Sequence, residues 1–485
     1  MRKLLLAGVA VIGSVGLANA QTTTTTTTTT AAPAPLPMSN LGYPQQPSSY
    51  LGGNNANNQD GSALVAGPQS PTPGSMVIHL QGRVWAYAGF GGGSGYINTK
   101  TVDGVTTTAK LNPMQFIGYF RLYPGVDAMA TNGLRYGAIV EIRQNFIGQG
   151  YGSTTAGLQG AGANYSTSPS GDSSSSTLYV RREAVYLGSN SLGILRIGQD
   201  DGPFSQFDNG VTTFQYGSGA WNGDGPDNIP GNAQPTFPFW SGIGAEYAVS
   251  KAVYFSPRFA GFDVAVSYAP NNGSNNASAC PVAEAGCLAL SSNPTGAFGG
   301  ADRPTNWVEA MARYQGTFGG FGIYAIAGYS ASGNVKNTAP GSQKYQGFSV
   351  GDAGLVLSYA GFSVGGNVLW GAYNNQVQLA PKGGVNAVAW LGGVAYVNGP
   401  WQGYASYYNY QYQGAGPGPG IGQRYDDAAF VGAQYAIAPG LNAYAEYLYG
   451  QSHQGGVNLL NGGTDTGVNN NVHIQSFIIG TRVQW

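Results

Sequence analysis

Charged residues are scarce in this chain of 485 residues, since Asp, Glu, Lys and Arg make up 8% of it. Soluble domains carry about 25%, so the composition argues against an ordinary soluble enzyme. The formal net charge of −1 gives no electrostatic basis for a nucleic-acid partner. The 2 cysteines and 3 histidines exclude a cysteine-rich metal site, and we expect neither a metal nor another cofactor.

Long apolar runs are also missing. Beyond residue 20, no stretch reaches the roughly 18 uninterrupted apolar residues of a membrane-spanning helix, so a membrane location would have to be reached through strands. Glycine and aromatic residues are abundant instead, with 79 Gly, 32 Tyr, 19 Phe and 8 Trp. A hydrophobic content of 42% gives the chain enough apolar surface to bury, which argues against disorder over most of its length.

The N-terminal part divides into two segments. A basic start, an apolar run at residues 4–15 and an Ala-Asn-Ala site ending at residue 20 predict a signal peptide over residues 1–20. A membrane anchor is the alternative, but about twelve apolar residues are too few to span a bilayer. Residues 21–75 contain nine consecutive threonines, and Pro, Ser, Asn, Gln and Gly dominate thereafter. Such a composition buries too little to offset its ordering entropy, so we expect a disordered linker.

Alternation with a period of two residues runs through the rest of the chain. Over residues 79–87, one face reads His, Gln, Arg, Trp, Tyr and the other reads Leu, Gly, Val, Ala. Residues 115–123 alternate in the same way. This period marks strands with two unlike environments. Because it persists without a helical period, it predicts all-β structure over residues 76–485.

The connections between these strands alternate in length. Seven short turns alternate with eight long polar segments, which predicts sixteen strands. Antiparallel strands of even number, with short connections on one side and long ones on the other, are typical of an outer-membrane barrel. We therefore predict an all-β fold, a sixteen-stranded antiparallel transmembrane β-barrel, whose closure removes exposed edges. The long segments are residues 91–112, 148–176, 200–245, 271–304, 331–348, 375–385, 412–425 and 451–472.

The last strand has its own signature. Phe477, Ile479 and Val483 alternate along it, and the strand ends in Trp485. Such a strand resembles the signal by which barrel-assembly machinery recognises its clients. We therefore expect Trp485 to act as an assembly signal and that machinery to be a partner.

Two stretches resemble the general trimeric porins of Gram-negative outer membranes. Residues 254–262, Tyr-Phe-Ser-Pro-Arg-Phe-Ala-Gly-Phe, are similar to the porin turn pattern Tyr-x-Ser-Pro-x-Phe-x-Gly-Phe. Residues 182–198 are similar to the hairpin before the porin constriction loop. Gly198-Gln199 stands where the family often has Gly-Arg, and the Pro-Glu-Phe-Gly-Gly element of the third loop is absent. The resemblance implies a homotrimer with its early strands at the interface and a third loop folded into the barrel.

A constriction is expected between that loop and the barrel wall. The third long segment, 200–245, carries five aspartates and no Lys or Arg. Alternation and the family pattern place arginines on the facing wall. A transverse field between the two would orient polar solutes and tune ion selectivity. The candidates are Asp208, Asp224 and Asp227 on the loop and Arg83, Arg121, Arg143 and Arg182 on the wall. The structural alternatives are pairing of Arg182 with its neighbours and solvated loop acids.

Two further groups of residues have structural interpretations. Cys280 and Cys287 lie in the fourth long segment, and in an exported protein we expect them to form a disulfide. Eight large aromatic residues are expected in girdles at the lipid interfaces, a sugar-stacking path being the alternative. They are Trp85, Tyr119, Trp221, Phe239, Trp240, Trp370, Trp390 and Trp401.

The sequence therefore predicts a porin of the bacterial outer membrane, not an enzyme, for passive diffusion of small hydrophilic solutes and ions. Selectivity should be weak, with the loop acids favouring cations. Outer-membrane lipid and lipopolysaccharide are expected around it, the latter bridged to loop carboxylates by divalent cations. Three alternatives remain: a substrate-specific sugar channel, which usually has about eighteen strands, a non-conducting adhesive or structural barrel, and an enzymatic barrel. None of the 3 histidines sits in an activating motif.

Overall fold

The computed structural model describes most of the predicted barrel. The described residues are 71–102, 105–145, 178–189, 191–212, 217–223, 225–230, 233–240, 249–271, 292–293, 303–337, 341–463 and 467–485. The predicted signal peptide and residues 21–70 of the predicted linker lie outside them. Within the described ranges, no helix combines the length and the apolar character needed to cross a bilayer.

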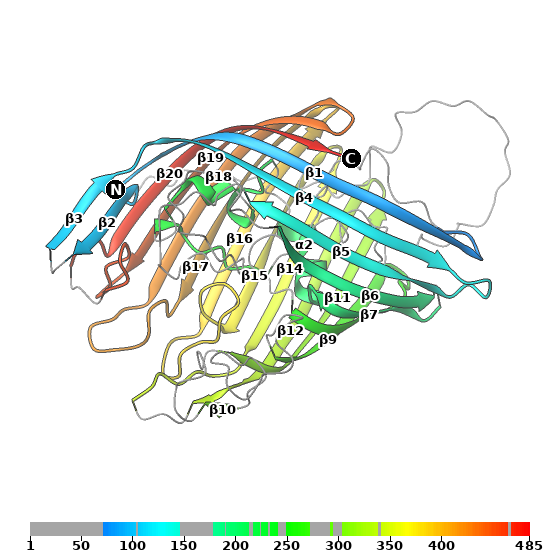
Figure 1. Cartoon of the computed structure of the whole chain (residues 1–485), viewed down its shortest axis with the longest axis horizontal. Coiled ribbons are helices and arrows are strands. Elements are labelled where there is room, and N and C mark those ends of the chain that lie inside the picture. Colours follow the sequence, from blue (N-terminus) through cyan, green and yellow to red (C-terminus); the bar gives the residue numbers. More distant parts are fainter. Residues whose placement is uncertain are drawn as a thin grey trace.

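Sixteen antiparallel strands close into one barrel, as predicted (Figure 1). The strands of the ring are β1 (Ser75–Gly92), β4 (Met114–Met129), β5 (Arg135–Asn145), β6 (Tyr179–Ser189), β7 (Gly193–Asp200), β8 (Val249–Phe255), β9 (Phe262–Asn271), β11 (Pro304–Phe318), β12 (Phe321–Asn334), β14 (Ser349–Tyr359), β15 (Phe362–Ala372), β16 (Ala387–Asn398), β17 (Trp401–Tyr412), β18 (Arg424–Ala438), β19 (Leu441–Gln454) and β20 (Asn471–Gln484). The ring closes because β1 pairs with β20 on one side and with β4 on the other.

The connections are sorted by length as predicted. Seven short turns lie at one end of the barrel, the turn end, and eight long connections lie at the other, the loop end. The first long connection contains a hairpin of β2 (Ile97–Val102) and β3 (Val105–Lys110), which extends beyond the ring (Figure 1). Two short strands, β10 (Ser292–Asn293) and β13 (Lys336–Asn337), pair in parallel and join the connections that follow β9 and β12.

The outer face of the barrel is apolar. In β20, Phe477, Ile479 and Val483 are exposed, whereas Ser476, Ile478 and Arg482 are buried. At the turn end, an outer belt of exposed aromatic rings runs from β9 to β18. Phe321 and Tyr359 pair within it at 4.3 Å between ring centroids, and Trp401 and Tyr435 pair at 4.6 Å. Such a belt is typical of the level at which a barrel meets the lipid interface.

The predicted girdle contains only three of the eight aromatic residues assigned to it. Trp370, Trp390 and Trp401 are exposed on the outer face. The prediction is wrong for the other five, which are buried: Trp85, Tyr119, Trp221, Phe239 and Trp240. The physical reason is that the first two lie on the inner, arginine-bearing face of their strands, and the other three belong to the third long connection.

Glycine and aromatic residues are often directly opposite each other on neighbouring strands. The cross-strand pairs are Gly137 with Tyr186, Gly351 with Trp370, Gly432 with Tyr404 and Gly480 with Tyr444. In each pair the ring covers the glycine so closely that a Cβ atom there would overlap it. At the seam of the barrel, the ring of Trp485 covers Gly82 in the same way. At these positions glycine is required because a large flat side chain needs a bare backbone beneath it.

The third loop is residues 201–248 between β7 and β8, and its described parts contact the inner side of the barrel. Its described elements are α2 (Pro203–Thr212), η3 (Ala220–Asn222) and η4 (Gly225–Asn228). Helix α2 packs against β11, β12, β14 and β15, whereas η4 packs against β1, β4 and β20. These two groups of strands lie on opposite sides of the ring. The loop therefore reaches from one wall to the other, and Figure 1 shows α2 between the walls.

Candidate functional site

Three arginines form a row across neighbouring strands of one wall. Arg83 of β1 lies opposite Arg121 of β4, which lies opposite Arg143 of β5. All three are buried on the inner face. The guanidinium carbons of Arg83 and Arg121 lie 4.4 and 4.9 Å from the centroid of the Trp85 ring, so both stack on one indole. Like charges directly opposite each other are unfavourable in a sheet, and stacking on Trp85 and pairing of Arg143 with Glu141 offset that cost.

Two carboxylates, those of Glu141 and Asp201, form ion pairs with arginines of this wall. Glu141 of β5 contacts Arg143 and accepts hydrogen bonds from Nε of Arg182 at 2.6 Å and Nη1 of Arg181 at 3.2 Å. Asp201, directly after β7, contacts both Arg181 and Arg182 at 2.8 Å. The pairing register between β5 and β6 shifts beside Glu141. Such a bulge lets two successive side chains reach the same face, so Arg181 joins Arg182 there.

These residues form what we call the basic wall: Arg83, Arg121, Arg143, Arg181, Arg182, Glu141 and Asp201. Its five arginines and two carboxylates leave a formal charge of +3. Burial alone would raise the pKa of Asp201, but the charges of Arg181 and Arg182 outweigh it and lower that pKa below its ordinary value. Asp201 is therefore ionised at neutral pH, and the wall keeps its charge pattern.

The predicted loop acids lie in different places. Asp227 is on η4, beside the basic wall, and accepts a hydrogen bond from the hydroxyl of Tyr119 on β4. Asp208 lies in α2, which packs on the opposite wall, and its side chain is not among the described ones. Asp224 lies outside the described residues. The structure thus brings the four predicted arginines and one predicted acid to the same side of the barrel.

Sequence reasoning missed the wall residues that hold the middle of the third loop. Glu446 of β19 accepts hydrogen bonds from the backbone nitrogen of Ser218, at 2.9 Å, and from its hydroxyl. Arg482 of β20 donates to the carbonyl oxygen of the residue before Ser218, at 3.1 Å. Asn228 and Ser476 exchange hydrogen bonds of 2.7 and 3.1 Å. Alternation places these strand residues on the inner face, but no local sequence pattern predicts that they bind the third loop, which is distant in the sequence.

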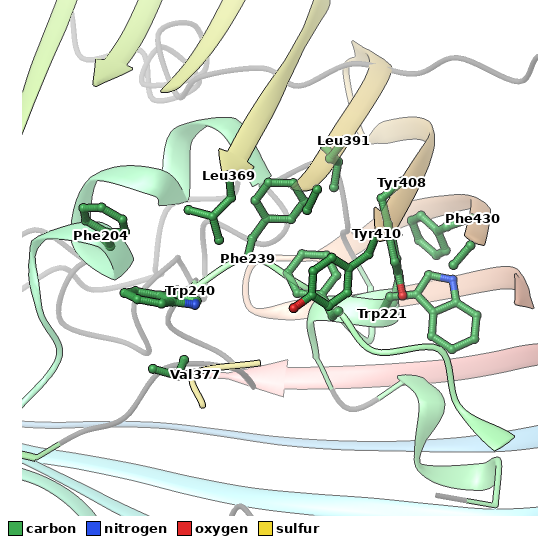
Figure 2. Close-up of a cluster of buried hydrophobic side chains, with 14 of the residues drawn as sticks. Phe204, Trp221, Phe239, Trp240, Leu369, Val377, Leu391, Tyr408, Tyr410 and Phe430 are labelled. Carbon is green, nitrogen blue, oxygen red and sulfur yellow. The ribbon is translucent and has the colours of Figure 1, made fainter. Parts of the chain in front are cut away.

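The opposite half of the interior contains a cluster of aromatic rings (Figure 2). Trp240 of the third loop lies 5.8 Å from Trp307 of β11 and 5.0 Å from Phe348, between ring centroids. It lies 6.1 Å from Tyr373. Phe348 and Tyr373 belong to the connections after β12 and β15, so two loop-end connections share this core. The rings around Trp240 therefore lie on the side of the interior opposite the arginine row.

The structure does not test the predicted disulfide or the predicted assembly signal. Cys280 and Cys287 lie outside the described residues, so their disulfide stays a prediction. Trp485 lies at the seam beside Gly82, and its role in assembly stays a prediction. In the described part of the chain, no three His, Cys, Asp or Glu side chains gather in a way that could hold a metal ion.

Comparisons with known proteins agree with this architecture. The family model described as Gram-negative porin matches residues 84–455. The anion-selective porin from Comamonas acidovorans is similar in structure, with a TM-score of 0.50 and 15% identity over 85% of this chain and 100% of that one. The outer membrane channel DcaP of Acinetobacter baumannii has a TM-score of 0.47 and 10% identity, over 86% of this chain and 100% of that one. OmpT of Vibrio cholerae has a TM-score of 0.44 and 13% identity, with the same coverage of 86% and 100%.

No curated protein matches the sequence. At 15% identity, the Comamonas structure supports the fold alone, whereas the family match spans most of the barrel. The chain therefore belongs to the Gram-negative porin family, and it is a multi-pass β-barrel that forms a porin channel in the bacterial outer membrane.

Proposed function

We propose that this porin is a narrow diffusion channel that favours small anions and passes them between the third loop and the basic wall. The observation that carries the proposal is the formal charge of +3 on that wall. A positive wall raises the local concentration of anions and lowers that of cations. Asp227 on the facing loop supplies the negative pole of a transverse field that orients polar solutes.

The aromatic half of the interior supports this path. Rings around Trp240 pack between the third loop and the strands opposite the basic wall. Glu446 and Arg482 hold the middle of the loop, so the narrowing is a fixed part of the channel. The sequence alone favoured cations, because five aspartates lie on the loop. Of these five, Asp201 is already counted in the charge of the basic wall, and Asp227 is the further described loop acid beside it. We therefore propose the opposite preference.

We propose a homotrimer that assembles through the early strands. At the turn end, β1, β4, β6 and β7 present aliphatic side chains such as Ile78 and Leu187, whereas the outer aromatic belt covers β9 to β18. Tyr136 of β5 is the exception. Aromatic girdles mark contact with the lipid interface. The gap in the aromatic belt over the early strands therefore supports the proposal that neighbouring subunits, not lipid, cover this part of the outer face.

Further proposals concern biogenesis and surroundings. We propose export with cleavage before Gln21, a linker over residues 21–75, recognition of Trp485 by the barrel-assembly machinery, and lipopolysaccharide around the loop end. Cys280 and Cys287 are proposed to form a disulfide in the oxidising compartment. Passive diffusion needs no catalytic group, so the proposed activity is transport without catalysis.

Recordings from the purified, folded protein in planar bilayers test the channel and its preference. We expect stepwise conductance in groups of three, and a reversal potential under a KCl gradient that lies on the chloride side. Lys382→Gln is a matched control, because it removes a positive charge from an exposed loop-end connection and should leave the reversal potential unchanged. A potassium-side reversal potential would contradict the anion preference, and a silent folded protein would contradict the channel.

A further inference from the structure

Two of the 3 histidines of the chain lie on neighbouring strands at the loop end. His453 is near the end of β19 and His473 is near the start of β20, and both side chains are exposed on the outer face. In the pairing register, His453 lies opposite Asn471, and His473 lies opposite Gln451. The two imidazoles are therefore diagonal neighbours, about 7–8 Å apart at the backbone, a separation that aromatic side chains can bridge.

The other diagonal of these four positions is closed by a hydrogen bond. Nε2 of Gln451 donates to Oδ1 of Asn471 at 2.9 Å. Side chains of comparable length thus meet across this part of the outer face, and the two amides bind each other instead of the histidines. Within the described part of the chain, the imidazole of His453 has no hydrogen-bond partner, so its ring nitrogens are open to a ligand.

The ring of His473 is held in a fixed orientation by the segment that follows β1. Its Nδ1 lies 3.0 Å from the hydroxyl oxygen of Ser94, and this hydroxyl also accepts a hydrogen bond from the backbone nitrogen of His473 at 3.0 Å. The backbone nitrogen of Gly95 donates to the carbonyl oxygen of His473 at 3.2 Å. With its proton on Nδ1, the imidazole donates to Ser94 and presents the lone pair of Nε2. Metal-binding histidines are typically oriented by such a contact from their other ring nitrogen.

The charges around the two histidines favour a cation. Asp427 of β18 lies on the same outer face, beside the histidine-bearing stretch of β19. Its carboxylate accepts hydrogen bonds from the side chains of Tyr407 and Asn409, which are neutral and do not offset its negative charge. The arginines of β18 and β20, Arg424 and Arg482, lie on the inner face, where they contact other groups of the interior. A cation at the two imidazoles is therefore attracted by a carboxylate on its own face of the barrel.

We propose that His453 and His473 bind one divalent transition-metal ion of the class of Zn²⁺, Ni²⁺ and Cu²⁺ on the outer rim of the loop end. Imidazole nitrogen is a preferred ligand of these ions. Metal–nitrogen bonds of about 2 Å let two diagonal rings share one ion, and water completes its coordination. Because the histidines flank the connection between β19 and β20, the ion joins the two ends of that connection. The site lies on the outer face, so it is independent of the proposed anion preference.

Copper binding to the purified, untagged, folded protein tests the site. Equilibrium dialysis against Cu²⁺ should give one ion per chain, and the electron paramagnetic resonance spectrum should show splitting by two nitrogen ligands. In His453→Gln and in His473→Gln, the dissociation constant should rise by at least about tenfold and one nitrogen should be lost from the spectrum. Ser94→Ala keeps both imidazoles but loses the contact that orients one of them, so its dissociation constant should rise roughly tenfold with two nitrogens retained.

A matched control is His79→Gln, the same substitution at the remaining histidine, which lies toward the turn end of β1. It should leave the affinity and the spectrum unchanged, and heat-modifiability gels should show that every variant is folded. An absence of copper binding in the wild type overturns the site. Equal affinity in the wild type and the double variant His453→Gln/His473→Gln also overturns it, as does a spectrum that His453→Gln leaves unchanged.

Discussion

Replacing Arg121 with glutamine removes the central charge of the arginine row. Arg121 lies opposite Arg83 and Arg143, and all three face the proposed solute path. A unit charge about 7 Å from a permeating ion contributes about 0.6 kcal/mol in water. The term is attractive for an anion and repulsive for a cation, so its loss changes their difference by about 1.2 kcal/mol. The anion-to-cation permeability ratio should therefore fall roughly sevenfold.

The same substitution should leave the barrel as stable as before. It removes two like-charge cross-strand contacts, each unfavourable by about 0.2–1 kcal/mol, and one cation–π contact worth roughly 0.5–1 kcal/mol. These terms have opposite signs and similar size. The assay is the reversal potential under a KCl gradient, with the thermal unfolding midpoint measured on the same preparation. A permeability ratio within about twofold of the wild type, in a folded Arg121→Gln, would refute the placement of this arginine beside the path.

Three further perturbations test the constriction, the seam and the ion pairs. Glu446→Gln weakens the contacts to Ser218 by about 1–3 kcal/mol, so single-channel currents should become noisier than in the wild type. Variant currents as quiet as those of the wild type would count against anchoring. Gly82→Leu places a side chain where the Trp485 ring lies, so the yield of barrel refolded in detergent, without assembly machinery, should drop on heat-modifiability gels. Trp485→Gly should recover part of that yield. The lowered pKa of Asp201 gives stability that is complete above about pH 4 and lost as pH falls through its folded pKa. The unfolding midpoint should decline in that acid range, and less steeply in Asp201→Asn.

The barrel was predictable because its signals are local. Side chains alternate across every strand, so the faces of Arg83 and Trp85 follow from their position in the strand. Turn residues set where each short connection falls, and their alternation with long segments fixed the number of strands. The path of the third loop was not local, which is why its aromatic residues were assigned to the outer girdles. Trp85 and Tyr119 were assigned there although alternation places them on the face of Arg83 and Arg121.

The partners of the arginines were less predictable for a physical reason. Arg181 reaches the inner face because of a bulge, and bulges have no strict sequence signal. Asp201 follows a strand end, and its pairing with Arg182 depends on how two strands meet. Glu446 lies at a regular inner position, but its partner Ser218 belongs to a loop whose path is set by packing. Local patterns give a residue its face, and long-range packing gives it its partner.

The glycine–aromatic pairs impose an order on evolutionary change. A side chain introduced at Gly432 would collide with the ring of Tyr404, and the same holds for Gly480 beneath Tyr444. Loss of the ring leaves a cavity but no overlap, whereas loss of the glycine first forces the ring out of place. Substitutions should therefore be accepted ring first and glycine second. Among related sequences the two positions should covary, and glycine without its ring should be found more often than the reverse.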